Sequence, residues 1–160
     1  MKQGFVKVAS ATPRIRVADP VYNAQVICEQ AKEAAEHGAK IVVFPELCIT
    51  GYTCNDLFLQ ELLLEKAKEA LLTIAEETGQ LETLFLVGLP VDKDGRLYNV
   101  AAVLYRGRIL GMIPKKNIPM YAEFYEGRHF KSGRDLDEYI TLCDQEIHVT
   151  TEQLFEDVNH

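Results

Sequence analysis

Short apolar segments that alternate with stretches of helical periodicity constrain the fold of this chain most strongly. Residues 40–44 and 84–89 are rich in β-branched and large apolar side chains, and their length suits buried strands. Between the strand-like residues 5–9 and the run at 40–44, apolar residues recur near a period of 3.6. The order strand, helix, strand, helix, strand and then a β-meander predicts an α/β domain with sheet and helix layers.

Turn signals divide the rest of the chain. Pro13 and Pro20 bound a predicted loop at 14–20, and Asp94-Gly95 predicts a hairpin turn. After Pro114 the chain is predicted to be mostly irregular, and nothing at its end closes the architecture, so the domain is expected to be cut off there. The predicted elements are strand 5–9, helix 22–37, strand 40–44, helices 57–63 and 64–78, and strands 84–89, 100–105, 108–113, 139–142 and 147–150.

Composition narrows the classes of function. The chain has 160 residues, and its formal net charge of -7 argues against a nucleic-acid partner and against a polybasic membrane patch. No apolar run approaches the roughly 20 residues of a membrane span, and the N-terminus lacks the features of a signal peptide. Four irregularly spaced cysteines and four scattered histidines predict neither disulfides nor a metal site, so a cytoplasmic protein is expected.

Glu46 is the first candidate for chemistry. It follows the apolar run at 40–44, and ligands of open α/β sheets bind beyond the carboxyl ends of strands. A carboxylate that is partly desolvated there is suited to act as a general base. The alternative is a structural role, in which Glu46 caps a turn or pairs with a lysine.

Lys115 and the loop that follows it are the second candidates. Lys115 comes directly after a predicted strand, where its charge could stabilise an oxyanion, although a solvated loop lysine is the alternative. Aromatic and acidic side chains then cluster in one loop, which is typical either of a pocket for a small polar ligand or of a loop pinned to the core. The cluster comprises Tyr121, Glu123, Phe124, Tyr125 and Glu126.

The cysteines are weaker candidates. Cys48 and Cys54 flank Gly51 close to Glu46, so either could be a nucleophile. However, a neighbouring carboxylate without a cation raises the pKa of a thiol. This favours the alternative that both cysteines are small buried side chains of the core. Cys28 and Cys143 are expected in the core.

Two long motifs resemble a known family. The segment 44–52, FPELCITGY, resembles a motif of the nitrilase superfamily, and Pro114-Lys115 resembles the lysine motif of the same superfamily. The extensions GYTCNDLF at 51–58 and PKKNIPMYAEFYE at 114–126 narrow the match. They resemble the N-terminal glutaminase domain of glutamine-dependent NAD synthetases, and GLP at 88–90 and LYNVA at 97–101 also fit.

The resemblance implies a fold and roles for particular residues. It implies a nitrilase-like αββα sandwich, incomplete at the C-terminus, in which Glu46 is the general base and Lys115 is the cationic member of a Glu-Lys-Cys triad. Glu126 would support Lys115 and the substrate amide, while Tyr121 and Tyr52 would line the glutamine pocket. The implied reaction is acyl transfer from the carboxamide of L-glutamine to a thiol, with release of ammonia.

The chain departs from the family pattern at the nucleophile. Cys143 is followed by Asp144 and Gln145 rather than by glutamate, so the resemblance places the catalytic cysteine after His160. Residues 1–160 are thus expected to form the N-terminal part of a carbon-nitrogen hydrolase domain and to be inactive alone. No cofactor is expected for them.

The resemblance also implies partners outside these residues. They are a C-terminal synthetase domain, which would bind ATP and Mg²⁺, and further copies in a homo-oligomer. A fragment of another nitrilase-type amidase or carbamoylase, or a non-catalytic binding module, remains an alternative.

Overall fold

A single seven-stranded sheet organises the chain in the computed structural model, which describes residues 4–122, 124–142 and 144–156. The predictions for Glu123 and Cys143 therefore fall outside the described residues. The strands lie in the order β1-β2-β3-β4-β5-β7-β6. The elements are β1 (Val8–Ser10), α1 (Pro20–Glu36), β2 (Ile41–Val43), the 3₁₀ helix η1 (Asn55–Leu59), α2 (Glu61–Glu77), β3 (Leu84–Lys93), β4 (Arg96–Tyr105), β5 (Arg108–Pro114), the 3₁₀ turn η2 (Glu126–Arg128), β6 (Asp137–Leu142) and β7 (Gln145–Thr150).

Strand directions follow from the lengths of the connections. The pairs β1–β2 and β2–β3 are parallel, and helices α1 and α2 lie in the connections between their strands. Strands β3, β4 and β5 form an antiparallel meander through tight turns. Strand β7 then pairs parallel with β5 and antiparallel with the edge strand β6. The predicted α/β class is confirmed.

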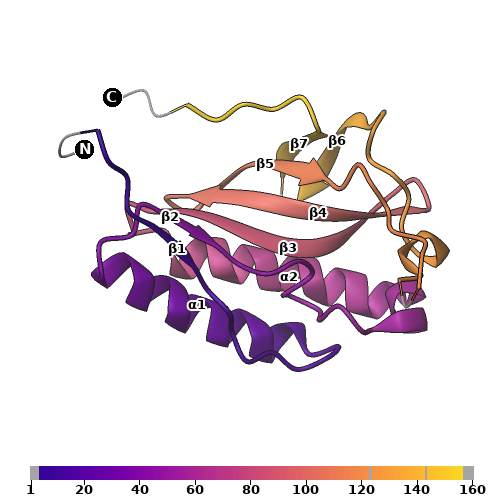
Figure 1. Cartoon of the computed structure of the whole chain (residues 1–160), viewed down its shortest axis with the longest axis horizontal. Helices are drawn as coiled ribbons and strands as arrows, with labels where there is room; N and C mark the ends of the chain where they lie inside the picture. Colours follow the sequence, from indigo (N-terminus) through magenta and orange to yellow (C-terminus); the bar gives the residue numbers. More distant parts are fainter. Residues whose placement is uncertain (1–3, 123, 143, 157–160) are drawn as a thin grey trace.

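Both helices cover the same face of the sheet (Figure 1). Each presents one apolar stripe to the strands, with Ile27 of α1 and Ile74 of α2 fully buried. On the sheet, Val42, Val87 and Ala102 point into the same core. Because side chains alternate along a strand, the intervening residues of β2, β3 and β4 face the other side. Residues 151–156 run along that opposite side (Figure 1).

The start of α1 differs from the prediction. The sequence predicts Pro20 as the last residue of a loop at 14–20, but Pro20 is the first residue of the helix. Asp19 caps the helix, since its side chain accepts a hydrogen bond from the N–H of Tyr22 at 3.1 Å. Proline is well suited to this position because its missing N–H would have no partner inside the helix.

The bounds of other helices and strands also differ from the predicted ones. The predicted helices 57–63 and 64–78 are instead η1 followed by one continuous α2, and the first strand is β1 rather than 5–9. Strands β3 and β4 extend nearly to the Asp94 turn, which lengthens the hairpin well beyond the predicted 84–89 and 100–105. The segments at 139–142 and 147–150 form a paired hairpin attached to the sheet.

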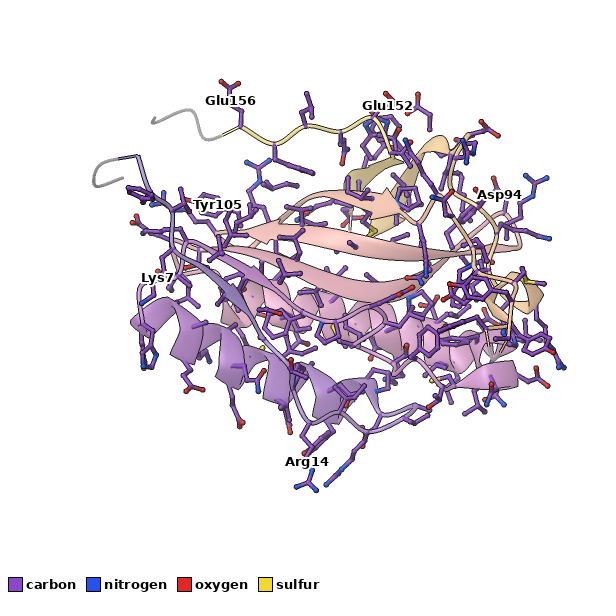
Figure 2. The ribbon with its side chains drawn as sticks, viewed as in Figure 1. Lys7, Arg14, Asp94, Tyr105, Glu152 and Glu156 are labelled. Carbon is purple, nitrogen blue, oxygen red and sulfur yellow. The ribbon has the colours of Figure 1, made fainter. Side chains whose placement is uncertain are left out.

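The β3–β4 turn and the loop between β5 and β6 lie at the same end of the molecule (Figure 1). Asp94, in the β3–β4 turn, lies at the opposite end of the molecule from Lys7 and Tyr105 (Figure 2). The loop between β5 and β6 lies at the Asp94 end (Figure 1). No helix among the described residues combines the length and apolar character that a membrane crossing requires.

Candidate active site

Glu46 lies just beyond β2, where the chain crosses over β3. A Cβ atom at Gly88 would lie 2.4 Å from the backbone nitrogen of Leu47 and 2.8 Å from the carbonyl oxygen of Pro45. The N–H of Ile49 also donates to the carbonyl of Gly88 at 3.2 Å. The absence of a side chain at Gly88 therefore lets the segment that carries Glu46 lie directly on the strand.

Lys115 is fixed at the end of β5 by two backbone hydrogen bonds. Its N–H donates to the carbonyl of Asn99 at 2.8 Å, and its carbonyl accepts from the N–H of Gly133 at 2.9 Å. These bonds tie the lysine to β4 on one side and to the loop before β6 on the other. Its side chain is 28% exposed, so the ammonium group lies at the surface of the site.

A small apolar cluster joins the loops around this lysine. Leu47 follows Glu46, Phe58 belongs to η1, and Phe130 follows η2, yet all three are buried together. The rings of Phe58 and Phe130 meet edge to face, with centroids 5.0 Å apart. The cluster holds the loops that carry Glu46, Tyr52 and Glu126 against one another.

The three predicted catalytic residues are brought together by direct contacts. The Nζ of Lys115 donates to Oε1 of Glu46 at 2.7 Å and to both carboxylate oxygens of Glu126 at 2.9 Å. The hydroxyl of Tyr52 donates to Oε1 of Glu126 at 2.7 Å. The side chain of Glu126 is 6% exposed and that of Glu46 is 41% exposed. One lysine thus bridges a buried carboxylate and a solvent-accessible one.

The surroundings of Lys115 favour its charged form. Burial, the largest single influence, lowers its pKa, but hydrogen bonds and charge attraction from Glu46 and Glu126 together outweigh it. The pKa of Lys115 is therefore raised above its ordinary value of 10.5. A lysine in this state is a permanent cation at neutral pH, as oxyanion stabilisation requires.

A groove of about 350 Å³ runs from these charges onto the sheet. Glu46, Asn99 and Lys115 form its polar end, and the rest is mostly apolar. Its apolar lining comprises Val43, Phe44, Pro45, Leu86, Gly88, Val100, Ala101, Ile113 and Pro114. Several of these side chains belong to the face opposite the helices, so the groove lies on that face.

Tyr121 does not contact the charged cluster through any hydrogen bond among the described residues. It is 69% exposed, and its ring meets that of Phe124 edge to face at 5.5 Å. The predicted pocket role of Tyr121 stays a prediction, whereas Tyr52 contacts the cluster directly through Glu126.

The described cysteines have the properties of buried side chains. Burial raises the pKa of Cys48 to about 12, and its thiol donates to the carbonyl of Gly88. Burial also raises the pKa of Cys54 and raises that of Cys28 to about 11. None of these three thiols is activated as a nucleophile would be.

Two residues of the site were not assigned roles from the sequence. Gly88 and Asn99 occur in the short segments GLP and LYNVA, but a single glycine or asparagine in a strand does not by itself indicate a role in catalysis. Asn99 is 3% exposed, and its side-chain amide donates to Oε1 of Glu46. A polar side chain within an apolar strand was the available hint, because buried amides are hydrogen-bonded.

A metal site requires several ligand side chains placed around one ion. Within 4–122, 124–142 and 144–156, no three His, Cys, Asp or Glu side chains are placed to hold an ion together. Lys115 is instead the cation that contacts both Glu46 and Glu126.

Curated relatives share this sequence over most of its length. Residues 7–147 match the family described as carbon-nitrogen hydrolase. The chain is 36% identical over 154 residues to the glutamine-dependent NAD(+) synthetase of Mycobacterium tuberculosis (strain ATCC 25618 / H37Rv), covering 96% of this chain and 23% of that relative. It is 35% identical over 136 residues to the enzyme of the same name from Thermotoga maritima, covering 85% of this chain and 23% of the relative. The chain thus spans about a quarter of the length of these relatives.

Solved structures share the fold. The crystal structure of a glutamine-dependent NAD(+) synthetase from Cytophaga hutchinsonii superposes with a TM-score of 0.84 at 27% identity, over 91% of this chain and 25% of that one. An amidase from Nesterenkonia sp. has the same fold, with a TM-score of 0.67 at 21% identity over 91% of this chain and 54% of that one. The predicted nitrilase-like architecture is therefore confirmed, and the chain belongs to the carbon-nitrogen hydrolase family.

Proposed function

We propose that this chain forms the base-and-lysine half of a glutamine amidohydrolase site, which serves a glutamine-dependent NAD synthetase. The observation that carries the proposal is the contact of Lys115 with both Glu46 and Glu126 at the polar end of an open groove. The names of the relatives supply the substrate, since each is called glutamine-dependent. A small amide substrate fits a groove that is apolar along its length and charged at one end.

The proposed chemistry assigns one step to each residue. Glu46 accepts the proton of a cysteine thiol, and the thiolate attacks the carboxamide carbon of glutamine. Lys115 stabilises the oxyanion that forms, while Glu126, which accepts a hydrogen bond from Tyr52, holds Lys115 in place. Glu46 then passes the proton to the leaving nitrogen, the C–N bond breaks, and ammonia departs. Water activated by Glu46 hydrolyses the thioester, which releases glutamate and restores the thiol.

The thiol in this scheme is none of the three described cysteines, whose burial raises their pKa. The proposal places it in the sequence that follows position 160, as the family resemblance implies. It also assigns ATP and Mg²⁺ to a synthetase domain that would use the ammonia. Assembly with that domain and into a homo-oligomer belongs to the same proposal.

A substrate panel tests this assignment. The full reading frame that encodes this chain is expressed, and ammonia release is measured from L-glutamine, L-asparagine, butyramide and an N-carbamoyl amino acid. The proposal expects L-glutamine to be preferred in kcat/KM by at least about a hundredfold over butyramide and the carbamoyl compound, because a site that hydrogen-bonds a substrate's polar groups strongly rejects analogues that lack them. Over L-asparagine, which keeps these groups and is one methylene shorter, the preference should be about tenfold or more. Preference for butyramide or for the carbamoyl compound would assign the chain to another amidase or to a carbamoylase. Absence of turnover with any of them would favour a binding module.

A further inference from the structure

The two oxygens of Glu46 have different surroundings. Oε1 accepts hydrogen bonds from Nζ of Lys115 at 2.7 Å and from the side-chain amide of Asn99. Among the residues that the structure describes, Oε2 accepts no hydrogen bond. Both donors therefore converge on one oxygen and leave the other unpaired.

Asn99 connects the base and the lysine through different groups. Its side chain donates to Glu46, while its backbone carbonyl accepts the N–H of Lys115 at 2.8 Å. Asn99 is 3% exposed on β4, so neighbouring strands fix its position. It is opposite Pro90 of β3, and it lines the polar end of the groove.

The chemistry of the amide determines how Asn99 faces Glu46. The amide nitrogen is a donor and the amide oxygen only an acceptor, so turning the oxygen towards the carboxylate would oppose two acceptors. An aspartate at this position would place a third carboxylate beside Glu46 and Glu126. Asparagine supplies a donor without adding charge.

We propose that Asn99 is a positioning residue that occupies Oε1 of Glu46 and leaves Oε2 as the oxygen that accepts the proton of the nucleophile. The inference rests on the proposed function and adds which atom acts as the base. In the proton transfer the S–H bond breaks and an O–H bond forms on Oε2. The same proton later passes from Oε2 to the nitrogen of the leaving ammonia.

The charged and titratable groups around Glu46 set the direction of the expected pH effect. Lys115 contacts it directly, and Glu126 and Tyr52 act through Lys115. Loss of the Asn99 donor removes a hydrogen bond that favours the charged carboxylate. The acidic limb of the pH–rate profile should therefore move to higher pH.

The first measurement compares variants in the product of the full reading frame. Asn99→Ala should lower kcat for glutamine by about 10- to 100-fold, the size expected for one hydrogen bond to a charged group, with KM changed by less than about twofold. The acidic limb should move with it, and Asn99→Ser should recover part of both effects through its hydroxyl donor. Asn23→Ala is the matched control, because Asn23 is also buried and its hydrogen bonds go to Arg16 and Ile49. It should leave the pH–rate profile of the folded enzyme unchanged.

Two outcomes separate the inference from the proposed function. If wild type hydrolyses glutamine and Glu46→Gln does not, while Asn99→Ala keeps the wild-type profile, the role of Asn99 is wrong and the function stands. If wild type does not hydrolyse glutamine, the proposed function fails. Crystal structures of wild type and Asn99→Ala then still test the positioning role. In the variant the carboxylate of Glu46 should rotate away from its wild-type orientation. A carboxylate in the same orientation in both structures would overturn the proposal.

Discussion

The ammonium group of Lys115 lies 2.9 Å from each carboxylate oxygen of Glu126, a side chain that is only 6% exposed. A buried carboxylate is unfavourable unless a partner balances its charge, and Lys115 does so from the more exposed side. The same ammonium group reaches Glu46 at 2.7 Å. The same lysine therefore contributes both to the stability of the loop that carries Glu126 and to the orientation of Glu46.

Removal of the Lys115 charge should destabilise the chain. Lys115→Met leaves Glu126 buried without its cation, and we expect a loss of about 2 kcal/mol in the free energy of unfolding. Urea denaturation measures it. The double variant Lys115→Met/Glu126→Gln should recover part of this loss because the buried charge is gone. Equal stability of the single and double variants would contradict the role of the Lys115–Glu126 pair.

The raised pKa of Lys115 predicts a pH dependence. A group whose pKa is raised on folding contributes stability that is fully present below its unfolded value and is lost as pH rises through the folded value. The difference in unfolding free energy between wild type and Lys115→Met should therefore be constant near neutrality and shrink above about pH 10.5. Parallel urea titrations of the two proteins measure this difference. A difference that grows towards high pH would be the opposite of the expected result.

Gly88→Ala should displace the segment that carries Glu46. The new Cβ would meet backbone atoms of Pro45 and Leu47 at 2.8 and 2.4 Å, and backbone cannot swing aside as a flexible side chain does. We expect a loss of about 2 kcal/mol or more in stability, measured by urea denaturation. Gly95→Ala is the control for a glycine with open space at its Cβ position, although its φ of +72° adds strain of its own. A Gly88→Ala protein as stable as wild type would contradict the close crossing.

The buried cysteines should resist alkylation. Because the pKa of Cys48 is about 12 and that of Cys54 is raised, little thiolate is present at pH 8. Peptide mapping after iodoacetamide treatment should show both cysteines unmodified in the native chain and both modified in urea above the midpoint of unfolding. Rapid modification of Cys48 in the native chain would reopen its assignment as a nucleophile.

The sequence patterns predicted which segments form helices and strands more accurately than they predicted where each of these elements begins and ends. The period of apolar residues in α1 was readable because one face of that helix is buried, but the role of Pro20 depended on the cap at Asp19. The sequence predicts two helices at 57–63 and 64–78, but the structure has one α-helix preceded by a 3₁₀ helix. The prediction differs because the apolar residues Leu57 and Leu59 belong to that 3₁₀ helix and not to the apolar face of an α-helix. Propensity does not distinguish these cases without tertiary contacts.

The sequence predicted the charged residues Glu46 and Lys115 of the candidate site, but it did not predict two of the residues that position them. Glu46 and Lys115 follow apolar runs, so their positions at strand ends were visible in the sequence. Asn99 and Gly88 act through contacts between strands that are distant in sequence, which no local pattern encodes. The burial of Glu126 was likewise invisible, because it depends on contacts with Tyr52 and Lys115 across three loops.

The most direct test of the central claim is glutamine hydrolysis by the Glu46→Gln variant. The product of the full reading frame is assayed for ammonia release from L-glutamine, beside a Glu77→Gln control that removes the same charge from an exposed α1–α2 ion pair. The proposal predicts a loss of at least about a hundredfold in kcat for Glu46→Gln, since general-base catalysis is removed, and wild-type activity for the control. Wild-type turnover by Glu46→Gln would show that Glu46 is not the base.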